Sequence, residues 1–513
     1  MINDLLLGID IGTQGVKGLL VEPTGKIIYQ YQVEHDSFCP QPDWCEHDMA
    51  TNWWENPVFV LRQLLQTDGV HSEQIKAISI SGLYPAMGPT DGNGNPLARA
   101  ILYSDNRSTA EVYEVNKALG LQLSGEELTP KLLWFLRNEP ELASRMKMFF
   151  DAPHYLVFKL TGEYVTDTIT AGLYGAIYQS PTVTWREQVC ERFGIPLEIL
   201  PRVYTPAHVI GTVHRQAAEA TGLAPGTPVL TSLPDLVASL ISVGAVHTYE
   251  SAAYYGTAGL VPVMKDDLLN AMFKPYPIEE RGITPQDGYI FDYPSYCLTV
   301  GDALRWFRDE FAPLETERQR SGNAPSAYAQ LDALAERVPP GSEGLILLPY
   351  LLGQRSPEFN PSASGVFFGV KRAHTRGHLY RAILESFGFN IRHGLENFYP
   401  QGHPLKRLVA TGGGARSPLW RQIVSDITCL PQEYIPESDG PLGAAYLAGI
   451  ALGWFKDFET LKKDWVQIAG ITQPNPTMSA VYDHAYAIYV ELHSVLKSVF
   501  SHSYYPSESS HVQ

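Results

Sequence analysis

Two glycine-containing turns, one in each half of the chain, have the composition of phosphate-binding loops. Each lies between two apolar stretches typical of strands, which predicts a hairpin whose turn offers backbone N–H groups and a threonine hydroxyl. Such donors suit the phosphates of a nucleotide. The residues concerned are Gly12, Thr13, Gln14 and Lys17 in the first half, and Gly256 and Thr257 in the second. The pair predicts two related domains that clamp one nucleotide, and the alternative is two ordinary hairpin turns.

Two aspartates lie where an α/β sheet places reactive groups. Asp10 ends the strand before the first turn, where a carboxylate can hold a metal ion. Asp235 follows the apolar stretch 229–233 and opens a helix of small residues. It is either a helix N-cap or a base aimed into a cleft, because ligands of α/β sheets bind outside the carboxyl ends of the strands.

Polar side chains after two further strands form a candidate wall for a polyhydroxylated ligand. Tyr84 lies in the loop after the buried-type strand 75–81. Asp105 and Arg107 follow another strand and offer complementary acceptors and donors, and Tyr103 offers a face for C–H groups. The structural alternative is an internal Asp–Arg ion pair, and the local sequence leaves both open.

A third glycine-rich turn lies near the end of the second half. Residues 408–420 form a strand, a run of three glycines and a helix N-terminus. Consecutive glycines let the backbone approach a flat or anionic ligand closely. We therefore favour a ligand-binding turn over a purely structural one.

Length, composition and charge narrow the class of protein. A chain of 513 residues is too long for one core and favours two domains. A net charge of −17 argues against a general binder of nucleic acid or anionic membranes, which needs a basic surface. No stretch has the length of a membrane span, and the first residues enter a strand without a signal-peptide pattern. Five scattered cysteines without metal-ligand spacing predict reduced thiols in a cytoplasmic protein.

The elements that position these residues alternate between strands and helices, which predicts an α/β fold. Helices are expected over about 53–66, 131–138, 154–160, 301–307, 378–397 and 440–449. The polar, Ala- and Glu-rich stretch 313–340 predicts a peripheral helical insert, and the residues after about 499 predict a frayed tail.

Taken together, these stretches resemble the FGGY family of carbohydrate kinases over roughly residues 5–460. One family signature is matched by Gly365-x-Phe367-x-Gly369-Val370 and, seven residues on, His378-Leu379-x-x-Ala382-Ile383-Leu384-Glu385; Lys131-Leu132-x-Trp134 matches another in part. The resemblance implies an α/β fold of two actin-like ATPase (ribonuclease H-like) domains with an interdomain catalytic cleft. It implies an N-terminal domain, 1–247, for the sugar and the base, a C-terminal domain, 248–490, for the nucleotide, and a tail, 491–513.

The family mechanism then implies roles for the matching residues. Asp235 resembles the general base that takes a proton from the sugar hydroxyl, and Asp10 resembles the carboxylate that holds Mg²⁺. Asp105 and Arg107 match positions on the sugar side, with Tyr84 in the substrate loop. The positions similar to nucleotide-pocket residues are Gly301, Gly412, Gly413 and Ser417. ATP and Mg²⁺ are the cofactors that this similarity implies.

The expected activity is ATP-dependent phosphorylation of a primary hydroxyl of a ketopentose. Pattern and length are most similar to xylulose-phosphorylating members of the family, but Gly82-Leu83-Tyr84-Pro85 stands where those have Gln-Met-His-Gly. Ribulose, gluconate and a deoxy-ketose are therefore alternative substrates. A sugar-sensing relative with impaired catalysis and an actin-like assembly protein without sugar kinase activity also stay open. We expect no nucleic-acid or membrane partner, and a homodimer stays open.

Overall fold

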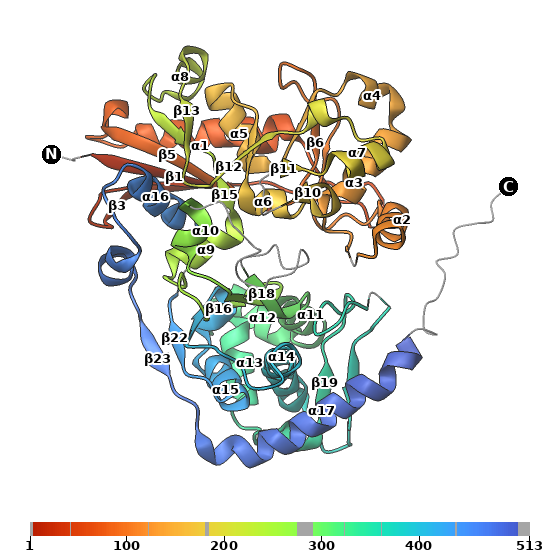
Figure 1. Cartoon of the computed structure of the whole chain (residues 1–513). Coiled ribbons are helices and arrows are strands. Elements are labelled where there is room, and N and C mark those ends of the chain that lie inside the picture. The colour runs from red at the N-terminus through yellow and green to blue at the C-terminus, as the bar shows by residue number, and fades with distance from the viewer. Residues whose placement is uncertain are drawn as a thin grey trace. The chain divides into compact units, whose positions relative to one another are not determined.

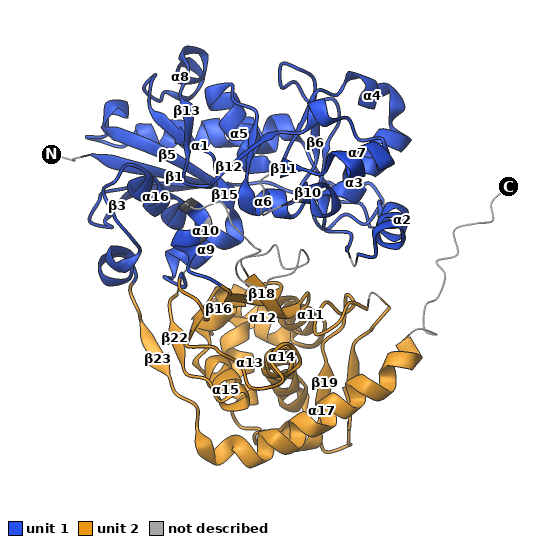
Figure 2. Ribbon diagram, viewed as in Figure 1, with its two compact units in different colours: residues 1–246, 266–290, 439–466 blue, residues 247–265, 291–438, 467–513 orange. Residues whose placement is uncertain are grey.

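In the computed structural model, the described residues are 4–41, 43–121, 123–179, 184–273, 291–322, 324–360, 362–436 and 439–500. The chain divides into two compact units (Figure 2). Unit 1 comprises residues 1–246, 266–290 and 439–466, and unit 2 comprises 247–265, 291–438 and 467–513. The first boundary lies beside the expected one at 247. The later ones do not follow the expected contiguous division, because the segment 439–466 returns to unit 1.

Unit 1 is built on a mixed sheet that includes the strands labelled β1, β3, β5 and β13 in Figure 1. The strand order is β13-β14-β5-β1-β2-β3, with β15 also paired to β5. The strands β1, β2 and β3 form an antiparallel meander, and β5, β14 and β15 run parallel to β1. Their bounds are β1 Leu5–Gly12, β2 Gly15–Val21, β3 Ile27–Glu34, β5 Ile75–Gly82, β13 Val209–Thr212, β14 Pro228–Leu230 and β15 Leu233–Pro234. The mainly apolar pattern of β1 fits its central place, since a strand covered on both faces reads as a continuous hydrophobic run.

Unit 2 repeats this topology with the order β18-β17-β16-β21-β22-β23. In chain order, β16, β17 and β18 again form an antiparallel meander, β21 and β22 run parallel to β16, and β23 is antiparallel to β22. The bounds are β16 Glu250–Tyr255, β17 Gly259–Met264, β18 Phe291–Cys297, β21 Arg407–Thr411, β22 Gln432–Tyr434 and β23 Gly470–Thr472. The two predicted phosphate turns therefore occupy equivalent places, between the first and second strands of each sheet.

Helices alternate with the strands in both units, and the helices expected from the sequence are among them. In unit 1 they include α1 Asn56–Leu65, α2 Thr109–Leu119, α3 Leu128–Asn138, α5 Ala152–Thr161, α6 Thr168–Gly172, α8 Arg215–Thr221, α9 Asp235–Ser242 and α16 Gly440–Ala451. In unit 2 they include α11 Gly301–Phe311, α12 Pro313–Arg320, α13 Ala327–Ala335, α14 Arg376–Phe398, α15 Pro418–Thr428 and α17 Ser479–Phe500. The expected tail from 491 thus begins within α17, and its residues 501–513 lie outside the described ranges.

Close backbone contacts explain why α16 joins unit 1. A Cβ on Gly8 of β1 would lie 1.8 Å from the carbonyl oxygen of Pro441, and one on Gly443 would lie 1.9 Å from that of Ala238 in α9. Only glycine allows these approaches. The small-residue helix is therefore pressed against both β1 and α9. Among the described helices, none is long and apolar enough to cross a membrane.

Candidate active site

The carboxyl ends of β1, β5 and β15 bring two predicted site residues to one edge of the unit 1 sheet. Asp10 of β1 pairs with Ser81 of β5, which pairs in turn with Leu233 of β15. Asp235 follows β15 directly and begins α9. Burial and the neighbouring carboxylate of Asp10 raise the pKa of Asp235 to about 8. The backbone N–H of Leu236 donates to Asp235 Oδ1 and opposes this rise. The two aspartates thus interact electrostatically at the edge where α/β sheets bind ligands.

Asp10 is held in place from both sides. Ser81 Oγ donates a hydrogen bond of 2.6 Å to Asp10 Oδ1. A Cβ on Gly440, the first residue of α16, would lie 3.0 Å from the same oxygen, so a glycine lets the helix begin against the carboxylate. Burial raises the pKa of Asp10 to about 6; Ser81 and Lys17 oppose the rise and Asp439 adds to it.

Asp439 lies beside Lys17 and acts electrostatically on Asp10, a proximity that sequence reasoning missed. Its Oδ2 lies 2.9 Å from Nζ of Lys17, and its backbone N–H donates to Ser242 Oγ at 3.0 Å. Its Oδ1 is buried and has no hydrogen-bond partner among the described residues. No sequence signal linked it to Asp10, because it lies in the segment that returns to unit 1 from far along the chain. Over the described ranges, no three His, Cys, Asp or Glu side chains gather in a metal-binding group.

The first turn is anchored to unit 1 through its carbonyl oxygens. His35 Nε2 lies 3.1 Å from the carbonyl oxygen of Gly12, and His47 Nε2 lies 3.1 Å from that of Thr13. The backbone N–H of His35 donates to the carbonyl of Gln14 at 3.0 Å. In a trans peptide the C=O and the following N–H point in opposite directions. The N–H groups of Thr13 and Gln14 therefore face away from these anchors.

Both anchoring histidines have lowered pKa values. The indole N–H of Trp53 donates to His47 Nδ1 at 3.1 Å, so the ring proton is on Nε2 and is donated to the Thr13 carbonyl. Burial and the neighbouring His35 lower the pKa of His47 to about 4, and burial also lowers the pKa of His35. Neither histidine was assigned a role from the sequence.

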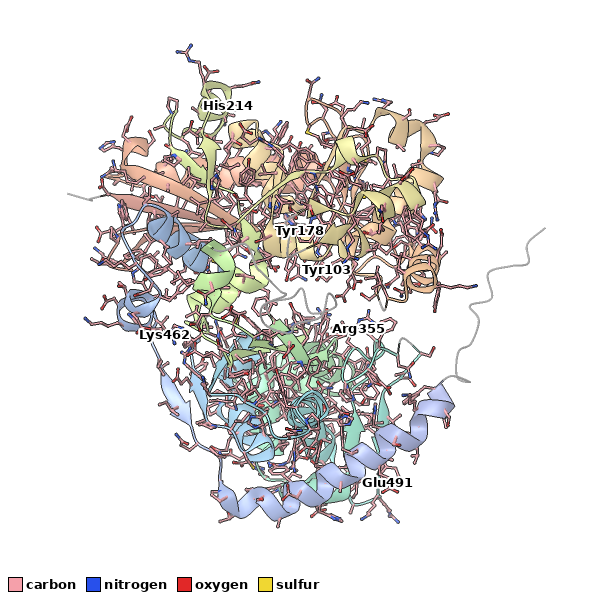
Figure 3. All side chains as sticks on the ribbon, viewed as in Figure 1. Tyr103, Tyr178, His214, Arg355, Lys462 and Glu491 are labelled. Atoms are coloured by element: carbon pink, nitrogen blue, oxygen red, sulfur yellow. The ribbon has the colours of Figure 1, made fainter. Side chains whose placement is uncertain are left out.

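Two tyrosines lie at the same edge of unit 1. Tyr84 is in the loop after β5, whose first residue, Leu83, donates its N–H to the carbonyl of Ile11 at 2.8 Å. Tyr103, labelled in Figure 3, forms a side-chain hydrogen bond with Thr13. Burial raises the pKa of Tyr103, and the charge of Asp235 adds to the rise. Its contact with Thr13 and its electrostatic interaction with Asp235 make Tyr103 a stronger candidate for sugar binding than the sequence alone indicated.

Asp105 and Arg107 form the internal ion pair that was the structural alternative. Asp105 is fully buried, and its carboxylate accepts from the N–H of Cys45 at 2.6 Å and from Arg107 N, Nε and Nη2 at 3.0, 2.9 and 2.7 Å. The Arg107 guanidinium also contacts Glu46 at 2.7 Å and stacks on Trp44 at 3.6 Å. Both oxygens of the Asp105 carboxylate therefore already accept hydrogen bonds from residues of unit 1.

Unit 2 contains a pocket of about 740 Å³, within the usual size range of small-molecule sites. The predicted nucleotide-binding residues that line it are Gly256, Thr257, Gly301, Gly413 and Ser417. Gly412 directly precedes Gly413. A Cβ added to Gly412 would lie 3.2 Å from the backbone of Tyr255, and its φ is +94°. The structure thus brings residues from both glycine turns of unit 2 and from α11 around one pocket.

Backbone contacts join the second turn to α11. Gly301 N–H donates to the Gly256 carbonyl at 2.9 Å, and Asp302 N–H donates to the Thr257 carbonyl at 3.1 Å. A Cβ on Gly301 would lie 2.5 Å from that Gly256 oxygen, which explains why the helix begins with glycine. The turn and the helix N-terminus are therefore one rigid wall of the pocket.

The expected peripheral insert also contributes to the pocket. Its prediction as helical is confirmed by α12 and α13, but its prediction as peripheral is wrong, because Tyr328 and Asp332 of α13 line the pocket. Asp332 forms side-chain hydrogen bonds with Ser417 and Tyr380, which oppose the effect of burial in raising its pKa. The polar composition of the stretch gave no signal of this role.

These two sheets, one with a carboxylate edge and one with a glycine-walled pocket, define a phosphotransferase of the actin-like ATPase fold. The chain belongs to the FGGY family of carbohydrate kinases: residues 5–242 match its N-terminal domain and residues 252–452 its C-terminal domain. It is therefore an ATP-dependent carbohydrate kinase, and the predicted family and fold are confirmed.

Several relatives match over nearly the whole chain. A xylulose kinase from Staphylococcus epidermidis is 25% identical, with 97% of this chain and 98% of the relative covered. A gluconokinase from Bacillus subtilis is 30% identical, with 89% of each covered. The crystal structure of a xylulose kinase from Rhodospirillum rubrum is 29% identical and has a TM-score of 0.84, with 97% of this chain and 100% of that chain covered.

Proposed function

We propose that this kinase phosphorylates a primary hydroxyl of a ketopentose, xylulose or a close relative, with Asp235 as the general base. The observation that supports Asp235 as the base is its place directly after β15, at the sheet edge that also carries Asp10, where burial and that carboxylate raise its pKa to about 8. A carboxylate of that basicity suits removal of a hydroxyl proton while the hydroxyl attacks the γ-phosphorus. Phosphoryl transfer otherwise depends on positioning and charge neutralisation, which the remaining residues supply.

The nucleotide side of the proposal rests on the two turns and the pocket. In unit 1 the Thr13 and Gln14 N–H groups face away from their carbonyl anchors and are available to phosphate oxygens. In unit 2 the pocket beside Gly256 and Gly413 has the size and the mainly apolar lining that a nucleoside needs. That both units grip one ATP across a cleft remains a prediction.

Asp10 and Asp439 fit the implied magnesium ion. The Asp439 Oδ1 atom is buried without a described partner, and an oxygen donor of this kind suits Mg²⁺, which keeps several waters and takes one or two carboxylates. When bound, the ion neutralises phosphate charge. Asp10 would hold it from the strand end and Asp439 from the start of α16, while Lys17 restrains the second oxygen of Asp439.

The choice of sugar rests on the relatives. Xylulose kinases match this chain over nearly its full length, which favours xylulose. Gluconate is the second candidate, because a gluconokinase has 30% identity. Membership of a carbohydrate kinase family argues against an assembly protein. A soluble sugar metabolite and thiols that are free among the described cysteines suit a cytoplasmic enzyme.

The experiment is a coupled assay of ADP release over ketopentoses, polyols and aldonates with Mg-ATP. We expect one ketopentose to raise turnover steeply, and Asp235→Asn to lower it by roughly three orders of magnitude or more, the range of general-base catalysis combined with positioning. Asp68→Asn, an exposed aspartate of unit 1, is the matched control. Near-normal turnover in Asp235→Asn would refute the base, and gluconate as the best acceptor would refute the ketopentose.

A further inference from the structure

His154 connects the loop before Asp235 to two buried carboxylates. The imidazole is 2% exposed and lies in the first turn of α5. Its Nδ1 is 2.5 Å from Asp151 Oδ1, and its Nε2 is 2.9 Å from Ser232 Oγ. The same Nε2 is 3.0 Å from the backbone N of Asp167 and 3.4 Å from its Oδ2. One side chain thus joins α5, the end of β9 (Val165–Asp167) and the loop between β14 and β15.

The loop residue that His154 contacts has an unusual backbone. Ser232 has a φ of +118°, a value that residues with a side chain rarely adopt, and it is fully buried. Such conformations persist only where the surroundings hold them in place, and they gather at functional sites. Ser232 is followed by the two residues of β15, which pair with Ser81 and Gly82, and then by Asp235. The direction in which the chain leaves Ser232 therefore sets where Asp235 begins α9.

The two carboxylates that hold His154 are themselves fixed. Asp151 is the N-cap of α5 and accepts from the backbone N–H of His154 at 3.1 Å. Asp167 is the N-cap of α6 and accepts from the N–H groups of Ile169 and Thr170 at 2.8 and 3.0 Å. Burial alone would lower the pKa of His154, but these carboxylates raise it above its ordinary value. The imidazole is therefore a rigid connector rather than a side chain free to choose its partner.

We infer that His154 is a positioning residue for Asp235: it holds Ser232 in its positive-φ conformation and so aims the carboxylate that follows β15. The inference rests on the proposed role of Asp235 as the base. His154 acts on that carboxylate only through Ser232, since its own polar contacts are with Asp151, Asp167 and the Ser232 hydroxyl.

The test is a double-mutant cycle between His154→Asn and Ser232→Gly. Glycine adopts a φ near +118° without a restraint, so it removes the need for His154. We expect H154N to lower kcat tenfold to a hundredfold with the KM values for sugar and ATP changed less than threefold. In the S232G background the same H154N change should cost less than threefold. Because a glutamine side chain can place an amide near the Nε2 position, H154Q should lose less kcat than H154N.

Controls separate this inference from folding and from the proposed function. His214→Asn, at the start of α8, removes a capping histidine of unit 1 without touching the loop and should leave kcat unchanged. Circular dichroism and ADP affinity show whether each variant is folded. If Asp235→Asn is inactive but H154N lowers kcat equally in the wild-type and S232G backgrounds, the positioning role is overturned and the base assignment stands. Turnover retained in Asp235→Asn would instead refute the base assignment.

Discussion

The Arg107 guanidinium donates to both carboxylate oxygens of Asp105, from Nε to Oδ1 at 2.9 Å and from Nη2 to Oδ2 at 2.7 Å. Both side chains are buried, and Glu46 and Trp44 enclose the guanidinium. This pair ties the loop after β7 (Ala100–Ile101), which carries Tyr103, to the segment that carries His47. Its removal should therefore act first on the stability of unit 1.

Asp105→Ala should lower the free energy of unfolding of unit 1 by about 3–5 kcal/mol, because it leaves a buried guanidinium without its carboxylate. Urea unfolding followed by tryptophan fluorescence measures this loss. Glu114→Ala is the matched control, since the Arg137–Glu114 pair is exposed and should contribute less than about 1 kcal/mol. Unchanged stability with a raised sugar KM would show instead that Asp105 contacts the sugar.

Asp439→Asn should weaken metal binding, because it removes the charge of the carboxylate whose Oδ1 has no described partner. We expect the dissociation constant of the ion to rise about tenfold, equivalent to about 1.4 kcal/mol. Electron paramagnetic resonance of Mn²⁺ in the presence of ADP measures binding without turnover. Asp464→Asn, an exposed aspartate of the same segment, is the control. An unchanged Mn²⁺ affinity would remove Asp439 from the metal site.

Asp235 should make the stability of the ligand-free protein fall as the pH rises. Its carboxyl has a pKa of about 8 in the folded state, against an ordinary value of 3.8, so folding takes up a proton between about pH 4 and pH 8. Relative to Asp235→Asn, the wild-type protein should lose roughly 5 kcal/mol across this window and none below it, since each unit of pKa difference corresponds to about 1.4 kcal/mol. Urea unfolding of both proteins near the two ends of the window, without Mg²⁺ and nucleotide, measures the difference. Parallel stability curves would contradict the raised pKa.

His47→Leu should weaken nucleotide binding by releasing the Thr13 carbonyl. The loss of one hydrogen bond to the turn predicts a rise in ADP dissociation constant of roughly fivefold to thirtyfold, or about 1–2 kcal/mol. His47→Gln, whose amide can donate to the same carbonyl, should lose less, and His71→Leu, at an exposed position, serves as the control. Isothermal titration calorimetry measures the affinities. Since the pKa of His47 is about 4, its contribution should not vary between about pH 6 and pH 8.

Local pattern was sufficient to predict the elements and the positions of the glycine-containing turns. Alternating apolar strands and helices predict the α/β fold, and the helix expected over 378–397 is α14, Arg376–Phe398. The glycine turns at Gly12 and Gly256 are recognisable because a hairpin with a tight turn is encoded by adjacent residues. Asp235 is recognisable for the same reason, since a strand, a carboxylate and a helix follow one another directly.

Tertiary structure alone decided which distant residues complete these sites. Asp439 reaches Lys17 only because α16 returns to unit 1, and Asp332 of α13 reaches Ser417 only because the insert folds over the pocket. His154 of α5 contacts Ser232, which lies between β14 and β15 and is far from it in the sequence. The spacing of residues along the sequence carries no information on such long-range contacts. They depend on where two backbone segments can approach closely, as at Gly443 and Ala238. They also depend on which charged groups are buried, because a buried charge requires a partner.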